Sequence, residues 1–306
     1  MAANIGFVSF RIFGTDGVSL ETKKWADLFP RRGYRCFYFA GELDTSPENS
    51  YPVEEAHFSH PEISRLYHMA FYNQVRPPEL TEGIHHYREI LKQKLYRFVK
   101  ECNIDLLIPQ NALTIPLNIP LALALTEYIA ETGIPTIAHH HDFFWERKRF
   151  LSNCVWDYFN AAYPPHLKSI QHVVINSSAA NQLALRTGIS ATMIPNVMDF
   201  ETPPQPPDEY AADVREKLGI GEEELLILQP TRVVQRKGIE HAIELVARLE
   251  KPSTLVISHA SGDEGYEYQQ RVREYADLLN IKALFVNDII ADERGTTADG
   301  RKIYTL

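Results

Sequence analysis

The sequence predicts an α/β protein with two doubly wound parallel sheets, the second of them incomplete. Short apolar runs alternate with longer segments of helical periodicity over residues 4–195, a pattern typical of parallel strands with helices on both faces of the sheet. Four prolines then crowd into the polar stretch at 200–210. A second, shorter alternation follows this break. Together these observations indicate two domains of one architecture.

The first alternation predicts six strands in order along the chain. They are expected at 4–10, 34–39, 105–109, 135–139, 172–176 and 191–195, with helices at 18–32, 80–101, 117–132 and 178–187. Residues 41–78 carry several prolines and serines, which favours an irregular, lid-like insertion. Because parallel sheets bind ligands at the carboxyl ends of their strands, the loops after these strands should carry the chemistry.

The proline-rich stretch is the expected domain boundary. We expect an N-terminal domain at 1–200, a semi-rigid linker at 201–210 and a partial C-terminal domain at 211–306. The C-terminal part should contain helices at 210–218, 239–249 and 266–279 and strands at 225–229, 254–258 and 283–286. Three strands make a thin doubly wound sheet, so we expect this domain to be cut short.

Composition excludes several classes of protein. A net charge of −9 and 23% charged residues argue against a protein-wide surface for nucleic acid. The three cysteines form no CxxC pair, which favours reduced thiols in a cytoplasmic protein. The N-terminus lacks the features of a signal peptide. The apolar stretch at 115–130 is too short and too interrupted to cross a bilayer, although contact with a membrane surface stays open.

A glycine-containing loop follows the first expected strand. Gly14 and Gly17 lie in FGTDGVSLETKKW, residues 13–25, between a strand and a helix. Backbone N–H groups and a helix N-terminus at such a place can face an anionic ligand. The segment is not a full GxGxxG motif, so a plain tight turn is an equal interpretation.

Three consecutive histidines and Asp142 end the fourth expected strand. Neighbouring residues on a strand point to opposite faces, so residues 139–141 cannot all bind one metal ion, and we expect no metal site. The remaining interpretations are histidines that only pack and a His141 that contacts substrate. Arg147 and Arg149 follow, and arginine forks suit a carboxylated acceptor. A charge run on a helix surface is the alternative.

Two further segments carry polar residues at strand ends. Asn111 begins NALTIPLN after the third strand and should reach the ligand edge. Arg232 and Lys237 lie between a strand and a helix in the second domain, where two cations beside a helix N-terminus would clamp a diphosphate. A solvated basic turn is the alternative.

In this order and spacing, the segments resemble the retaining glycosyltransferases of family 4, which have the GT-B fold. The matching pieces are the Gly14 and Gly17 loop, the pair Pro135 and His141, the IPNxxD turn at 194–199, and the T-R-x4-K-G segment at 231–238. The resemblance implies two Rossmann-like domains facing a cleft. It spans essentially the whole chain, and it says more about the fold than about the substrate.

The resemblance also implies roles for these residues. Arg232 and Lys237 would neutralise the leaving diphosphate of a UDP- or GDP-linked sugar, with the Gly14 and Gly17 loop lying over it. His141 would contact the donor sugar. Asn111, Asp142, Arg147 and Arg149 are the candidates for the acceptor side, where a sugar or another small polar molecule would bind. Most members of the family need no metal, and the nucleotide sugar is a substrate rather than a cofactor.

One departure from the family pattern leaves alternatives open. The family's E-x7-E element and its GFG-type loop have no counterpart before Leu306, so we expect a C-terminally truncated chain. A sugar-nucleotide 2-epimerase shares the architecture and the phosphate clamp. A non-catalytic nucleotide-binding remnant is the second alternative. A dehydrogenase fits less well, because no GxGxxG follows the first strand.

Overall fold

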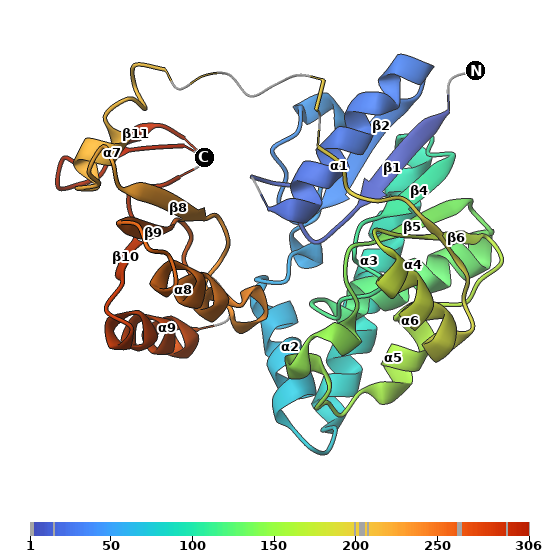
Figure 1. Cartoon of the computed structure of the whole chain (residues 1–306). Coiled ribbons are helices and arrows are strands. Elements are labelled where there is room, and N and C mark those ends of the chain that lie inside the picture. Colours follow the sequence, from blue (N-terminus) through green and yellow to red (C-terminus); the bar gives the residue numbers. More distant parts are fainter. Residues whose placement is uncertain are drawn as a thin grey trace. The chain divides into compact units, whose positions relative to one another are not determined.

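The computed structural model describes residues 3–14, 16–198, 200, 201, 206, 208–261, 265–291 and 293–305. The chain divides into two compact units, Met1–Met198 and Asp199–Leu306. Each unit contains its own parallel sheet (Figure 1). Residues 202–205 and 207 of the expected linker lie outside the described residues.

The described part of the first unit forms a seven-stranded sheet in the order β3-β2-β1-β4-β5-β6-β7. All neighbouring strands are parallel. The strand order reverses between β1 and β4, and such a switch point is where open parallel sheets bind ligands. The strands are β1 (Asn4–Val8), β2 (Arg35–Ala40), β3 (Ser50–Pro52), β4 (Leu106–Pro109), β5 (Thr136–His140), β6 (Ile170–Val174) and β7 (Ala191–Met193).

Helices cover both faces of this sheet. The larger core cluster joins α2–α5 to one face, and a second cluster joins α1 to the other. Asp16, Asn118 and Asn176 cap helix N-termini, where each side chain accepts backbone N–H bonds. The helices are α1 (Gly17–Leu28), α2 (Pro61–Tyr72), α3 (Pro78–Glu101), α4 (Ile119–Thr132), α5 (Trp156–Ala162) and α6 (Ser177–Thr187).

Short 3₁₀ turns connect several of these elements. They are η1 (Pro30–Arg32), η2 (Pro47–Asn49), η3 (Glu54–Ala56), η4 (Phe144–Glu146) and η5 (Lys148–Phe150). The turns η4 and η5 lie between β5 and α5, so they extend the segment that follows the three histidines.

The expectation of an irregular insertion at 41–78 is wrong. This region contains β3, which extends the sheet beside β2, and the helix α2. Pro61 stands at the first turn of α2, where its fixed φ suits a helix start. Ile63, Leu66 and Ala70 follow at helical spacing and are buried. The prolines therefore begin an element here rather than break one. The sequence prediction also missed α5.

The second unit has a three-stranded parallel sheet in the order β10-β9-β8 among its described residues. Its elements are α7 (Val214–Lys217), β8 (Leu225–Gln229), η6 (Gln235–Lys237), α8 (Ile239–Ala247), β9 (Ser253–Ile257), α9 (Glu267–Leu278) and β10 (Lys282–Phe285). The helix expected at 210–218 is only the single turn α7. The strands β11 (Gly295–Thr296) and β12 (Lys302–Ile303) form an antiparallel pair that the sequence prediction missed.

The predicted α/β class with parallel sheets is confirmed by these strand orders. No helix within the described residues is both long and apolar enough to span a membrane.

Candidate functional site

Asn111 organises a polar cluster at the carboxyl ends of β4 and β5. Its backbone has φ +57°, a left-handed conformation that asparagine tolerates better than most residues. Its side-chain Oδ1 accepts the backbone N–H of His141 at 2.8 Å and lies 3.4 Å from that of Asp142. Its Nδ2 donates to Asp142 Oδ1 at 2.7 Å. One buried amide therefore fixes the chain where it leaves β5.

Asp142 connects this amide to Arg147. Nε of Arg147 donates to Asp142 Oδ2 at 2.8 Å, and Nη2 also contacts the same oxygen. Both side chains are mostly shielded, with 16% of Arg147 and 24% of Asp142 exposed. An ion pair held in this way fixes the guanidinium plane, which prepares the remaining edge of Arg147 to bind another polar group.

The backbone N–H of His141 donates to Asn111, and its ring contacts the side chain of Gln110. Its Nε2 lies 2.9 Å from Oε1 of the buried Gln110. Because that oxygen only accepts, the bond places the imidazole proton on Nε2. Burial lowers the pKa of His141, although Asp142, Glu21 and Asp16 act in the opposite direction. The arrangement presents a neutral imidazole on the face of the sheet that carries α1.

The other two histidines obey the alternation of the strand. His139 shares the face of His141, and its ring stacks on Trp25 of α1 with 4.3 Å between centroids. The rings of His139 and His141 are also 4.3 Å apart. His140 points to the other face, where Nε2 lies 2.9 Å from Nδ1 of His172. As the sequence prediction required, the three imidazoles do not converge on one point.

Burial explains the electrostatics of these rings. It lowers the pKa of His139 to about 3 and that of His172 to about 4, and it lowers the pKa of the fully buried His140 well below its ordinary value. Nearby imidazoles lower these values further. No group of three or more His, Cys, Asp or Glu side chains in the described residues could hold a metal ion.

The glycine loop lies between β1 and α1, on the same edge of the sheet. The backbone N–H of Gly14 donates to Asp44 Oδ2 at 2.8 Å, and Lys23 binds that oxygen at 2.9 Å. Gly14 has φ +67°. Gly17 begins α1 behind the cap Asp16, and a Cβ added to it would meet nothing within 4 Å. Open space therefore surrounds the first residue of the helix, as an approaching ligand would require.

Arg149 lies on the turn that follows Arg147. It belongs to η5, and its guanidinium lies 4.9 Å from the ring centroid of Phe150. The structure brings Asn111, His141, Asp142 and Arg147 into one connected network.

In the second unit, Arg232 and Lys237 flank the turn between β8 and α8. Arg232 is half-buried and Lys237 is exposed. Gly238 takes φ +58° immediately before α8, and Tyr268 accepts the first N–H of the helix, from Ile239, at 3.0 Å. Lys237 thus lies two residues before the first residue of α8 and Arg232 seven residues before it, on the same connection.

Sequence reasoning missed two residues of the first unit's site. Gln110 immediately precedes Asn111, and its position at the end of a strand was a usable signal for a ligand-edge residue. Trp25 lies 114 positions before His139, and helical periodicity alone made it another core residue. Only the fold reveals their contacts with the histidines.

Comparisons with known proteins include two curated synthases of one name, while no model of a known family matches the chain. It is 34% identical over 253 residues to a mannosylglucosylglycerate synthase of Petrotoga mobilis, covering 81% of this chain and 57% of that protein. It is 29% identical over 309 residues to the enzyme of the same name from Thermotoga maritima, covering 93% and 69%. The chain thus spans well under the full length of both relatives.

Solved structures with a similar fold include glycosyltransferases. One from Rickettsia africae matches with a TM-score of 0.58 and 14% identity, covering 94% of this chain and 69% of that one. The Anabaena protein HepE, solved with UDP-glucose, matches with a TM-score of 0.53 and 14% identity, covering 94% and 70%. These similarities confirm the predicted GT-B type of fold.

Proposed function

We propose that this protein is a glycosyltransferase that moves a sugar from a nucleotide-diphosphate donor to a hydroxyl of a small carboxylated acceptor. The names of its curated relatives suggest mannose as the sugar and glucosylglycerate as the acceptor. The resemblance to family 4 adds retention of anomeric configuration to the proposal. The observation that carries it is the position of His141, fixed by Gln110 and Asn111 at the ligand edge.

His141 is proposed to contact the donor sugar. Cleavage of the bond between sugar and diphosphate gives the sugar ring positive charge and the leaving group negative charge. With its Nε2 proton donated to Gln110, the neutral imidazole can accept a hydroxyl of the sugar at Nδ1 without repelling the cationic ring. Because Gln110 and Asn111 hold the histidine in advance, no reorganisation is needed during the reaction, which is the condition for strong transition-state stabilisation.

Each unit offers positive groups that are proposed to bind a diphosphate. In the first unit these lie at Gly17, where the helix dipole favours an anion, because the N–H groups of Val18 and Ser19 already donate to Asp16. In the second unit they are Arg232 and Lys237. The leaving phosphate oxygen is proposed to take the proton of the acceptor hydroxyl as the new glycosidic bond forms. Neutralising the leaving group as its charge grows is then the main chemistry required, so the proposal includes neither a metal nor a dedicated carboxylate base.

The acceptor is proposed to bind beside Asp142 and Arg147. Asp142 already engages Nε and Nη2 of Arg147, which leaves Nη1 to bind an acceptor carboxylate. Arg149 is the second candidate for this role. A guanidinium held rigidly by a neighbour loses less side-chain entropy on binding, so the ion pair with Asp142 should strengthen acceptor recognition.

The test is transfer by the whole purified protein. Mannose and glucose donors linked to GDP or UDP are incubated with glucosylglycerate, and products are identified by mass spectrometry and their anomers by NMR. We expect one donor to give a retained product, and His141→Ala to lower kcat about 10²–10³-fold, as for other preorganised groups that stabilise a transition state. His86→Ala, an exposed residue of α3, is the matched control.

The same experiment separates the alternatives. Donor turnover without acceptor would identify an epimerase instead. Binding of GDP or UDP without any turnover would identify a nucleotide-binding module. For the clamp, Arg232→Gln and Lys237→Gln should each weaken nucleotide binding about tenfold, the effect of one charge-assisted hydrogen bond. Arg236→Gln, in the same turn, should bind as the unaltered protein does. If all three variants bind the nucleotide as tightly as the unaltered protein does, the clamp is excluded.

A further inference from the structure

A second site lies in the first unit, outside the Asn111 cluster. Between η4, α5 and the end of α6 is a pocket of about 420 Å³, a volume typical of small-molecule sites. None of its lining residues is His141, Asp142 or Arg147. The main lining side chains are Phe144, Trp145, Trp156, Tyr163, His166 and Arg186.

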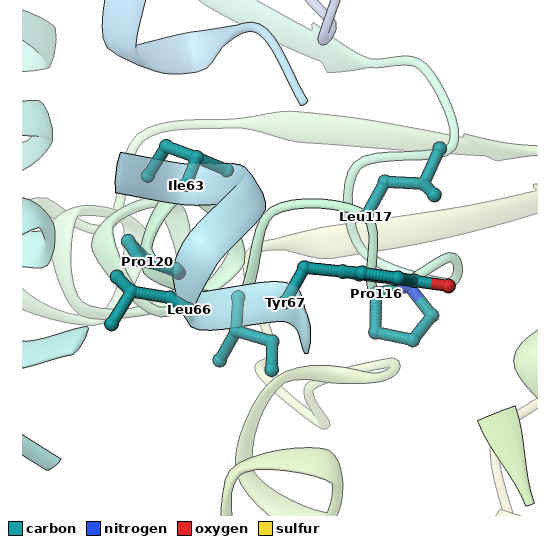
Figure 2. Close-up of a pocket in the computed structure, with 7 residues that line it drawn as sticks. Ile63, Leu66, Tyr67, Pro116, Leu117 and Pro120 are labelled. Carbon is teal, nitrogen blue, oxygen red and sulfur yellow. The ribbon is translucent and has the colours of Figure 1, made fainter. Parts of the chain in front are cut away.

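Another hollow of this unit has a different character. It lies beside α2 and is lined by Ile63, Leu66, Tyr67, Pro116, Leu117, Ile119 and Pro120 (Figure 2). It is too narrow to hold a water molecule. We therefore regard it as a feature of packing, and the larger pocket is the one with room for a ligand.

A cation is fixed on the wall of the larger pocket. The guanidinium of Arg186 lies 5.3 Å from the ring centroid of Trp145. Trp145 in turn stacks on the fully buried Phe143, with 4.4 Å between centroids and 5° between planes. Phe143 covers one face of the indole, so Arg186 occupies the other. Arg186 is exposed, and cation–π attraction favours this position of its charge modestly.

This cation faces no negative charge within the described protein. Arg186 forms no ion pair or hydrogen bond with a carboxylate in the described ranges, and the pocket lining contains neither Asp nor Glu. The polar lining residues are Asn160, His166 and Thr187 in addition to Arg186. A positioned guanidinium with its N–H groups available is a binding group for carboxylate or phosphate.

The aromatic walls favour a saturated ring over a flat one. The ring planes of Phe144 and Trp156 meet at 65°, those of Phe144 and Phe159 at 67°, and those of Trp156 and Phe159 at 70°. No two of these three rings are parallel, so they cannot stack on both faces of a planar base at once. A pyranose has apolar C–H faces for one aromatic surface and hydroxyls for the polar rim.

We propose that this pocket binds an anionic monosaccharide, a pyranose that carries a carboxylate or a phosphate. Arg186 binds the anionic group, Trp156 contacts the ring, and Asn160 and Thr187 bind hydroxyls. The site is separate from the proposed transfer site, and direct binding measurements test it whether or not the protein transfers sugar.

The test is calorimetry on the whole protein with four probes: D-glucuronate, glucose 6-phosphate, glucose and GMP. We expect at least one anionic sugar to bind about tenfold or more tightly than glucose, the effect of one charge-assisted bond. Glucuronate and glucose 6-phosphate distinguish a carboxylate from a phosphate ligand. A preference for either supports the proposal, whereas GMP binding that Arg186→Gln weakens more than it weakens binding of both anionic sugars would overturn it.

Matched variants locate the binding. Arg186→Gln should remove the preference for the anionic sugar, while Leu185→Ala, its exposed neighbour, should keep it. Trp156→Ala should weaken both neutral and anionic sugars, whereas Tyr72→Ala, another exposed aromatic residue, should bind as the unaltered protein does. Failure of both anionic sugars to bind, or equal affinity in Arg186→Gln and Leu185→Ala, would refute the assignment.

Discussion

Acid should unfold the first unit because its sheet buries neutral histidines. In the unfolded chain a histidine has a pKa of about 6.5, whereas the folded protein holds His139 at about 3 and His172 at about 4. A lowered folded pKa means that the unfolded state binds more protons as the pH falls. Stability is therefore full above about pH 6.5 and is lost progressively toward pH 4 and below.

The size of the effect follows from linkage. Between pH 6.5 and 4.5, a histidine that protonates only when unfolded costs about 1.36 kcal/mol per pH unit, or about 2.7 kcal/mol in total. His139 and His172 together should cost about 5 kcal/mol, and His140 adds to this in the same direction. That loss is comparable to the lower range of total stability for a domain, about 5–15 kcal/mol.

Urea unfolding at pH 7.5 and 4.5 measures this loss. All three tryptophans, at positions 25, 145 and 156, lie in the first unit, so their fluorescence reports on that unit. His139→Phe keeps a ring between Trp25 and His141 and removes one titrating group. We expect the loss of unfolding free energy between the two pH values to be about 2.7 kcal/mol smaller in this variant.

A matched control removes a histidine that stays hydrated. His86 is exposed on α3, and His86→Gln should lose as much stability between the two pH values as the unaltered protein. Because only the difference between pH values is compared, any repacking cost of the phenylalanine cancels. If His139→Phe and the unaltered protein lose the same free energy, the explanation through buried neutral His139 is wrong.

Three substitutions test the scaffold of the site. Asn111→Ala removes the acceptor for the N–H of His141. Calorimetry should show a loss of about 1–3 kcal/mol in the free energy of unfolding, because a buried N–H is left without a partner. The rate of sugar transfer should fall about 100-fold if the histidine moves by about 1 Å. Unchanged activity would contradict this role. Gly6→Ala would place a Cβ 2.8 Å from the ring of Phe98, so urea unfolding should show a cost of about 1–3 kcal/mol from overpacking. Gly17→Ala meets nothing within 4 Å and should keep the melting temperature but weaken GDP or UDP binding; unchanged nucleotide affinity would separate this loop from the diphosphate.

Sequence periodicity predicted the strands and helices of the main layers. It failed where the composition of a segment favoured a loop but its apolar residues favoured burial. Strands such as β4 and β5 are short apolar runs between helical patterns, so their existence was readable. Helix α2 was not, because the prolines and serines of residues 41–78 suggested a loop, whereas the burial of α2 against the core outweighed that preference. Strand alternation correctly separated His140 from its two neighbours, since a period of two holds for any extended backbone.

The centre of the candidate site was less predictable than its members. Asn111, His141, Asp142 and Arg147 were all candidates, but their connection depends on a left-handed backbone at Asn111 that turns its amide toward β5. The bond from Arg147 to Asp142 spans five residues across the 3₁₀ turn η4, where neither the α-helical period nor the strand period applies. Such contacts depend on how the carboxyl ends of β4 and β5 lie beside each other in the fold. No local sequence pattern predicts that arrangement.

The neutral state of His141 connects the electrostatics of the sheet to the proposed chemistry. Three carboxylates, those of Asp142, Glu21 and Asp16, favour a charged imidazole, yet burial outweighs them and lowers its pKa. A sugar that departs from its diphosphate becomes cationic, so a charged imidazole beside it would raise the barrier, whereas a neutral one can bind it. The stacking of His139 on Trp25 contributes to this burial. The apolar packing beneath the site therefore sets the charge state of the residue that the proposed reaction uses.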